Sequence, residues 1–305
     1  MDLPIDPIQY DASPQELIQG LPSQAACQRV FQAAGISIDV EDRNFAETLD
    51  ELSDIKLRQA ASQLRFAGVR TVYYYRIEGL RQISPDEATG RASDADSPGA
   101  YGPEVRTALR DNDRIYVVCD VPETGTQAQL SLSEENRETT VATFKPRSEL
   151  LAVRAPDEET ADATSVAVVD YLDLTDWSRV SFLDSGIRGR FEDTCVDGYS
   201  NLRLKNTNPH DHSKEIEVRS KESEVGELTD VREDAVVETL LKQNHLELNA
   251  ATGLISMTSG IYSSDVETSF DPRVTIGFPE GRVTFEQFVP EEILIKLDDI
   301  VRQSL

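Results

Sequence analysis

The sequence predicts an α+β protein in which a helical, winged-helix-like N-terminal module precedes mixed, largely antiparallel sheet-and-helix subdomains. Capped segments with apolar residues at helical spacing fill most of the first 66 residues. From residue 115 onward, β-branched and apolar segments recur between short connections that contain Gly and Pro. We divide the chain into a module at 1–82, a flexible linker at 83–103 and two α+β subdomains at 104–175 and 176–305.

The N-terminal module is predicted from helix start and stop signals. Ser13-Pro14-Gln15-Glu16 is a capping box with proline at the first helical position, and it opens a short helix. A second helix is expected over 23–34, a third begins after the capping residue Asn44, and a fourth covers 55–66. The β-branched and aromatic residues of 69–77 then predict a strand, which completes a helix-turn-helix outline with a wing.

The middle subdomain is expected to form a sheet with one long helix. We predict a helix at 104–110, and the helix from about 157 to 172 has acidic residues in its first turn, where the helix dipole favours them. The strands expected between these helices lie at 115–121, 127–132, 140–144 and 150–154.

The last subdomain repeats this mixture without an internal sequence repeat. Strands are expected at 199–205 and 215–220, a helix at 231–243, and a hairpin whose strands, 245–248 and 254–257, flank a glycine-containing turn. A second hairpin joins alternating residues at 274–278 and 283–285 across Pro279-Glu280-Gly281. Pro290 opens a terminal amphipathic helix.

The charge balance is strongly acidic. The 305 residues include 56 Asp and Glu against 30 Lys and Arg, for a net charge of -26, and only seven of the basic residues are Lys. A carboxylate-rich surface stays hydrated in molar salt, where the Debye length is about 3 Å, but repels itself in dilute buffer. We therefore interpret the composition as adaptation to high salt, typical of halophiles. The alternatives are an acidic partner for a basic protein and a mimic of nucleic acid.

The cysteines and the N-terminus suggest a cellular setting. Cys27, Cys119 and Cys195 are widely separated and odd in number, which is not the pattern of a disulfide framework. The acidic start, Met1 to Asp6, has no apolar stretch of the kind that signal peptides carry, and no segment has 18 consecutive apolar residues. We expect a cytoplasmic protein without membrane association.

One basic segment interrupts the acidic chain and is the candidate binding site. Residues 55–82 carry a local charge of +5, with Glu78 as their one acid. Basic side chains on the second helix and the wing of a winged helix can reach phosphates, while tyrosines can stack or hydrogen-bond. The residues that we single out for contact with nucleic acid or a partner are Lys56, Arg58, Arg65, Arg70, Tyr74, Arg76 and Arg81.

The same segment has an alternative interpretation as an internal clasp or a protein interface. Arginine suits ion pairs with carboxylates better than lysine does, so these side chains can join the segment to the acidic remainder of the chain. In that case the run Tyr73-Tyr74-Tyr75 is ordinary strand packing.

A further alternative concerns alternating charges on one predicted strand. Glu215, Glu217 and Arg219 share one face, and Asp197 lies upstream. The pattern faintly resembles the core of PD-(D/E)xK nucleases. The resemblance implies an acid pair that holds Mg²⁺ and a lysine that assists the attacking water. Arg219 stands where that family has its lysine, and the resemblance covers about 25 residues.

The remaining motifs do not define a metal or cofactor site. His210-Asp211-His212 lacks a third ligand nearby in the sequence, and the segment from Asp184 to Arg190 lacks both the lysine of a P-loop and the glycine spacing of a dinucleotide fold. We read both as turns. We predict no cofactor, no metal and no catalytic residue.

The function that follows is a non-enzymatic binding protein whose N-terminal module contacts DNA or another protein. The first alternative is a protein-interaction or structural component without nucleic-acid contact, and the second is the metal-dependent nuclease.

Overall fold

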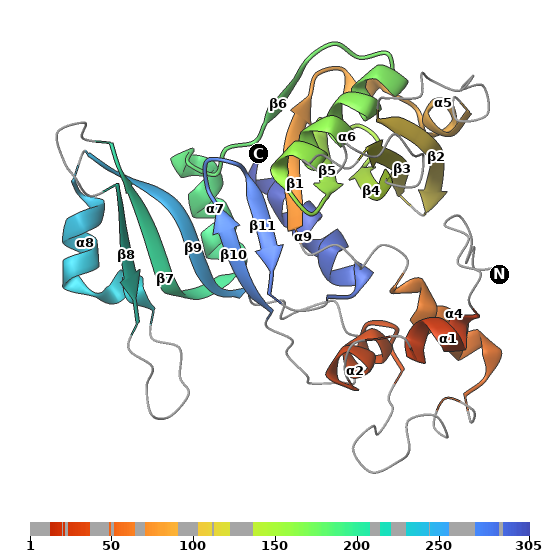
Figure 1. The fold of residues 1–305 in the computed structure, drawn as a ribbon, viewed down its shortest axis with the longest axis horizontal. Helices are drawn as coiled ribbons and strands as arrows, with labels where there is room; N and C mark the ends of the chain where they lie inside the picture. The colour runs from red at the N-terminus through yellow and green to blue at the C-terminus, as the bar shows by residue number, and fades with distance from the viewer. Residues whose placement is uncertain are drawn as a thin grey trace, which may run out of the picture. The chain divides into compact units, whose positions relative to one another are not determined.

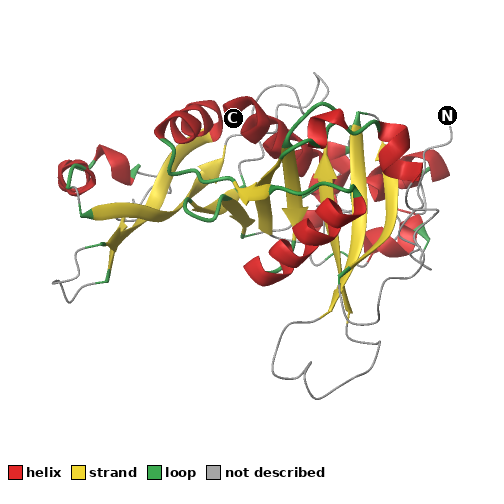
Figure 2. Cartoon of the chain, turned by 90° about the horizontal axis from the view of Figure 1, so that it is seen from above, coloured by secondary structure: helices red, strands yellow, loops and turns green. Residues whose placement is uncertain are grey.

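The fold was determined as a computed structural model. It describes residues 13–19, 21, 24–36, 49, 52–64, 71–90, 103–111, 113–122, 137–207, 214–220, 230–243, 245–255, 272–286 and 289–305. The structure confirms a mixed α+β protein with largely antiparallel strands (Figures 1 and 2). The predicted third helix and the strand at 127–132 fall almost entirely outside the described residues. No helix in the described ranges is long and apolar enough to cross a membrane.

The chain forms two compact units, and the first is assembled from three segments. Unit 1 comprises Met1–Arg70, Leu183–Phe278 and Phe285–Leu305, and unit 2 comprises Thr71–Phe182 and Pro279–Thr284. The basic segment at 55–82 is therefore divided between the units, because the chain passes from one to the other after Arg70.

Among the described residues, three short helices belong to the N-terminal part of unit 1. They are α1 (Pro14–Gln19), α2 (Gln24–Ala33) and α4 (Asp54–Ser62). The predicted capping box of α1 is present: the backbone N–H of Ser13 donates to Glu16 over 2.6 Å, and the N–H of Glu16 donates back to the Ser13 hydroxyl. The apolar faces of the helices meet in one cluster, which includes Ile18, Val30, Phe31, Leu49, Leu57 and Ala60.

In the rest of unit 1, the described residues form antiparallel strands and helices. The strands follow the order β10 (Arg273–Gly277), β9 (Leu246–Ile255), β7 (Val196–Asn206) and β8 (Glu215–Arg219). The helical elements are α7 (Ser185–Cys195), η4 (Val231–Glu233), α8 (Ala235–Leu241) and α9 (Glu291–Ser304). In α9, the apolar residues at helical spacing are buried, as the sequence predicts.

Unit 2 is built mainly of antiparallel strands. Their order is β2 (Glu104–Asp111), β3 (Arg114–Pro122), β4 (Arg137–Phe144), β5 (Leu150–Arg154), β1 (Thr71–Ile77) and β11 (Arg282–Phe285). The short β6 (Trp177–Arg179) pairs with the second half of β1, on the same side of β1 as β11. The elements η1 (Leu80–Gln82) and α5 (Pro85–Gly90) follow β1, and the long helix is α6 (Glu158–Tyr171).

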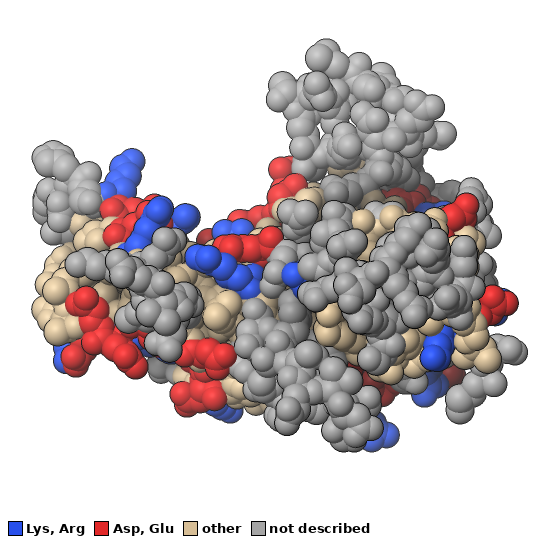
Figure 3. All heavy atoms as spheres, turned by 90° about the horizontal axis from the view of Figure 1, so that it is seen from below, with Lys and Arg blue, Asp and Glu red and all other residues tan. Residues whose placement is uncertain are grey.

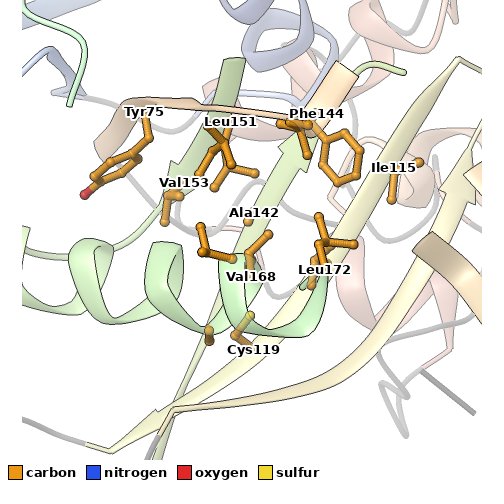
Figure 4. Close-up of a cluster of buried hydrophobic side chains, with 14 of the residues drawn as sticks. Tyr75, Ile115, Cys119, Ala142, Phe144, Leu151, Val153, Val168 and Leu172 are labelled. Atoms are coloured by element: carbon orange, nitrogen blue, oxygen red, sulfur yellow. The ribbon is translucent and has the colours of Figure 1, made fainter. Parts of the chain in front are cut away.

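The core of unit 2 lies between α6 and the sheet. Figure 4 shows Val168 and Leu172 facing Ala142, Leu151 and Val153, all with 2% of their surface exposed or less. Burial of a side chain of this size stabilises the folded state by roughly 1.5–3 kcal/mol. The first turn of α6 follows the sequence prediction, since Asp157 accepts the N–H of Thr160 over 2.8 Å.

The structure does not confirm a winged helix. The strand β1, which the sequence reading assigned to a wing, lies inside the sheet of unit 2, with β5 on one side and β11 and β6 on the other. Its residues are buried except Arg76, which is the pattern of a central strand rather than of an exposed hairpin.

Three predicted elements are wrong. Residues 104–110 are the strand β2 rather than a helix, because pairing with β3 along its length outweighs the helical composition. The expected turn between 245–248 and 254–257 is instead continuous strand in β9. The segment after Asp184 is the first turn of α7, capped by that side chain through the N–H groups of Gly186 and Ile187.

The glycine that suggested a turn in β9 has a different role. A Cβ on Gly253 would lie 2.2 Å from the carbonyl oxygen of Gly198 and 2.9 Å from the ring of Tyr199. The glycine therefore allows close approach of β9 to β7, as isolated strand glycines often do. A Cβ on Gly189, in α7, would meet nothing within 4 Å.

We therefore expect opposite effects from two glycine-to-alanine changes in unit 1. Gly253→Ala should lower the free energy of unfolding by about 2–4 kcal/mol, because backbone must move to admit the methyl group. Gly189→Ala should raise it by about 0.5–1 kcal/mol, since alanine favours the helix. Urea unfolding followed by circular dichroism measures both, and equal effects would contradict the assignment of close backbone contact to Gly253.

Candidate functional site

The helix α4 holds the part of the basic segment that the structure leaves on the surface. Leu57, Ala60 and Ala61 face the helical cluster, so the side chains of Lys56 and Arg58 are turned outward and exposed. Ile55 is also exposed, with 71% of its surface accessible. Within the described ranges, neither Lys56 nor Arg58 makes an ion pair. This outer face of α4, consisting of Ile55, Lys56 and Arg58, is the candidate site.

The orientation of α4 is set by its contacts with neighbouring helices. The side-chain amide of Gln59 donates to the carbonyl of Ala34, which follows α2, over 2.9 Å. After its last turn, the carbonyl of Gln63 accepts the N–H of Glu291, and its side-chain oxygen accepts the N–H of Glu292 over 3.2 Å. These bonds join α4 to α2 and to the start of α9, so its outer face is held in a definite orientation.

The three consecutive tyrosines lie in the core of unit 2. Tyr73, Tyr74 and Tyr75 each expose 2% or less of their surface. Tyr74 packs against Phe182, with ring centroids 6.0 Å apart, and its backbone pairs with neighbouring chain. The aromatic part of the predicted site is thus strand packing, and Tyr74 does not present its ring to a ligand on the surface.

The remaining basic residues do not gather with those of α4 in one unit. Arg76 is exposed on β1, and Arg81 forms an ion pair with Glu149 over 3.3 Å, both in unit 2. Arg65 and Arg70 lie outside the described residues. Arg81 therefore fits the interpretation of an internal clasp, whereas Lys56 and Arg58 keep their charges available.

The acidic residues of the nuclease alternative are spread along the sheet of unit 1. Glu217 binds its neighbours instead: it accepts from the amide of Asn201 over 2.6 Å and pairs with Arg203 and Arg219. These bonds hold the pKa of Glu217 below its usual value. Asp197 lies six residues before Arg203 on β7, about 20 Å along an extended strand.

No metal-binding group occurs where the structure describes the chain: no three His, Cys, Asp or Glu side chains lie together there. The geometry does not bring Asp197, Glu215 and Glu217 to a shared ion. His210-Asp211-His212 lies outside the described residues.

The structure reveals a polar cluster that the sequence reading missed. In unit 1, the guanidinium of Arg232 lies over the ring of Tyr199, 4.7 Å from its centroid, and binds Asp230 over 2.5 Å. The hydroxyl of Tyr199 donates to Glu192 over 3.0 Å, and Arg232 also approaches Glu192 at 3.7 Å. The cluster joins η4 to β7 and α7. In the sequence, the one sign of this cluster is the pair of opposite charges Asp230 and Arg232, which lie two residues apart just before a short helix.

The electrostatics of this Arg232 cluster indicate a structural role. Burial would raise the pKa of Asp230, but hydrogen bonds from the side chain and backbone of Arg232 and from the backbone of Tyr199 outweigh it and lower the pKa. Burial raises the pKa of Tyr199, and the adjacent Glu192 adds to the effect. These directions keep Asp230 ionised and the phenol of Tyr199 neutral, with their hydrogen-bonding groups directed at their partners in the cluster.

A similar cluster joins α6 to β6 in unit 2. The guanidinium of Arg179 donates to both carboxylate oxygens of Asp162, with its Nε 2.9 Å from Oδ1, and it also binds Glu158. Tyr75 donates its hydroxyl to Asp162 over 2.9 Å, and its ring meets Trp177 edge-on at 5.5 Å. This Arg179 cluster also ties secondary elements together.

Neither a protein-family model nor a curated protein matches this sequence.

The role of the Arg232 cluster can be tested by mutation. Arg232→Ala should lower the free energy of unfolding by about 1–3 kcal/mol, because it leaves Asp230 and Glu192 partly buried without their cation. Arg203→Ala, which removes an exposed arginine from the same unit, should change it by less than about 1 kcal/mol. Urea unfolding followed by circular dichroism compares the two, and equal losses would show that the cluster is not a stabilising contact.

Proposed function

We propose that the protein is a non-enzymatic binding protein, and that the outer face of α4 contacts an acidic partner protein. The observation that supports this most directly is the composition of that face. Ile55, with 71% of its surface exposed, lies beside two exposed cations in a chain with a net charge of -26.

An apolar side chain between two cations suits a protein partner. Ile55 can enter an apolar depression, while Lys56 and Arg58 reach carboxylates at its rim. Such an arrangement has the usual anatomy of an interface, with an apolar centre and a charged edge. The charges would mainly speed association and select the partner.

Nucleic acid is the second candidate, favoured by the same two cations. In that case Lys56 and Arg58 would contact phosphates as in the winged-helix interpretation, with α4 as the second helix. Two features weigh against it. The tyrosines that would stack on bases are buried in unit 2, and a net charge of -26 opposes approach to a polyanion.

The proposal is tested with a photoreactive amino acid at position 55. We expect it to cross-link to a discrete acidic protein in a lysate of the source cells, and the double variant Lys56→Glu/Arg58→Glu should reduce the yield at least tenfold. Arg106→Glu, which reverses an exposed cation on β2, is the matched control and should retain cross-linking.

The same proteins are then titrated against a labelled DNA duplex and an RNA strand by fluorescence anisotropy. Binding to either that depends on Lys56 and Arg58 would establish the nucleic-acid alternative instead. Absence of both cross-linking and nucleic-acid binding would contradict a binding role for α4.

We also propose that the protein is adapted to high salt. On the face drawn in Figure 3, acidic side chains are interspersed with basic ones rather than gathered in one block, which argues against a localised nucleic-acid mimic. At the start of α6, Asp157 and Glu159 are both exposed. Repulsion among such charges should limit stability in dilute buffer.

Salt adaptation predicts that the melting temperature rises by about 10 °C or more between about 0.1 M and 2 M KCl, because screening relieves this repulsion. Differential scanning calorimetry measures the change. Sucrose at equal osmolality is the control, since it stabilises by exclusion without screening. A melting temperature that is unchanged or lower in KCl would argue against the proposal.

A further inference from the structure

The strand β8 forms one edge of the unit 1 sheet. Its five residues pair with β7 alone among the described strands, in the register Arg203 opposite Glu217. Figure 1 shows β8 beside β7, at the end of the row β10, β9, β7, β8. An edge strand offers unpaired backbone groups to another chain.

The pairing with β7 identifies which groups these are. The N–H of Ser220 donates to the carbonyl of Ser200, and the N–H of Asn206 donates to the carbonyl of Lys214. In an antiparallel ladder the hydrogen-bonded pairs alternate, so the even-numbered residues of β8 direct their N–H and C=O groups to β7. Glu217 and Arg219 therefore direct theirs away from β7.

The side chains along this edge carry both signs of charge. Glu215, Glu217 and Arg219 are exposed on one face, whereas Ile216 and Val218 are half-buried on the other. Glu217 and Arg219 bind each other within the strand over 2.9 Å, so the acid and the base already lie together.

We propose that β8 pairs antiparallel with β8 of a second copy of this chain, with Val218 on the two-fold axis. This register places Glu217 opposite Arg219 of the second copy, and Arg219 opposite Glu217 of the second copy. Both are outward-directed residues, so each pair exchanges two backbone hydrogen bonds. The two sheets of unit 1 then continue as one.

Charge complementarity selects this partner and this register. Opposite charges that face each other across strands stabilise the pairing, whereas like charges destabilise it. With Glu217 on the axis instead, two carboxylates would face each other. With Val218 on the axis, two valines pack in the close, non-hydrogen-bonded position, and each Ile216 lies opposite Ser220 of the second copy.

The net charge of the chain makes this association dependent on salt. Two copies of charge -26 repel each other in dilute buffer, and screening at about 1 M salt shortens the range of that repulsion to about 3 Å. The pairs across the axis are in contact and are weakened less. The dimer should therefore form at high salt and dissociate at low salt.

Disulfide trapping tests the register in the full-length chain. A non-hydrogen-bonded pair has its Cα atoms about 4.5 Å apart, within the range of a disulfide, so Val218→Cys should form a covalent dimer on mild oxidation. Ile216→Cys is the matched control: position 216 lies roughly 13 Å along the strand from its counterpart and should remain monomeric. The native cysteines are buried and should not compete.

Sedimentation tests the backbone contact without a cross-link. Over protein concentrations of about 10 µM to 1 mM in molar KCl, the wild type should show a monomer–dimer equilibrium. Glu217→Pro removes an outward N–H but no hydrogen bond to β7, and should weaken dimerisation at least tenfold. Glu217→Val loses the same charge but keeps the N–H, and should retain more of the dimer.

Three results would overturn the proposal. They are a wild type that stays monomeric over the whole range, equal cross-linking at positions 216 and 218, and a dimer that Glu217→Pro leaves unchanged. Circular dichroism of each variant ensures that loss of the dimer is not loss of the fold.

Discussion

The burial of the terminal helix α9 is the constraint on which unit 1 depends. From Glu291 to Ser304, most side chains are buried, several are half-buried and Gln303 is exposed. Leu294, Leu297 and Val301 are completely buried, and α9 packs along α7. Its first N–H groups, which no intrahelical partner can satisfy, are accepted by Gln63 beside α4. The terminal helix is therefore joined to α7 by packing and to the end of α4 by hydrogen bonds.

The burial of α9 also places a carboxyl group, that of Glu292, in an unfavourable environment. Burial raises the pKa of Glu292 to about 7, and the nearby Lys296 only partly offsets the effect. A carboxyl with a raised folded-state pKa stabilises the fold at low pH and loses that contribution as the pH rises through about 7. The helix is thus held by apolar packing strongly enough to tolerate an unfavourable charge. Since unit 1 joins three distant segments, these contacts also have high sequence separation, which slows folding.

Arginine provides the internal connections in both units. Arg232 and Arg179 each bind two carboxylates, and Arg232 also lies over the ring of Tyr199, contacts that a planar guanidinium makes better than an ammonium group. The preference for arginine over lysine in the sequence therefore has a structural reason beyond surface charge. It also explains why a count of basic residues is a poor guide to a binding surface: Arg81 contributes to the local charge but is paired with Glu149.

Much of the secondary structure could be predicted, and the exceptions share a cause. The predictions that rested on local signals were correct, such as the capping box of α1, the first turn of α6 and the amphipathic pattern of α9. The predictions for β2 and for the middle of β9 were wrong, because contacts with other strands determine both segments. The strand β3 pairs along β2, and Gly253 lies against Gly198. The candidate site could likewise be predicted only where a local pattern determines it. Helical spacing placed Lys56 and Arg58 outward, but no local pattern showed that Tyr74 would lie in a core completed by Phe182, more than 100 residues later.

The alternating charges of β8 show how one pattern acquires different meanings. As a sequence, Glu215, Glu217 and Arg219 suggest one face of a strand and resemble a metal site. The structure separates the acids from Asp197 and pairs Glu217 with arginines, so the face carries salt bridges rather than a divalent ion. The alternation along the strand also decides which backbone groups point away from β7, because Glu217 and Arg219, which share this face, direct their N–H and C=O groups to that side. Charged side chains and outward-directed backbone groups therefore coincide at Glu217 and Arg219. An edge with charges of one sign would repel a second copy, whereas the order Glu, Glu, Arg permits self-complementary pairing in a register centred on Val218.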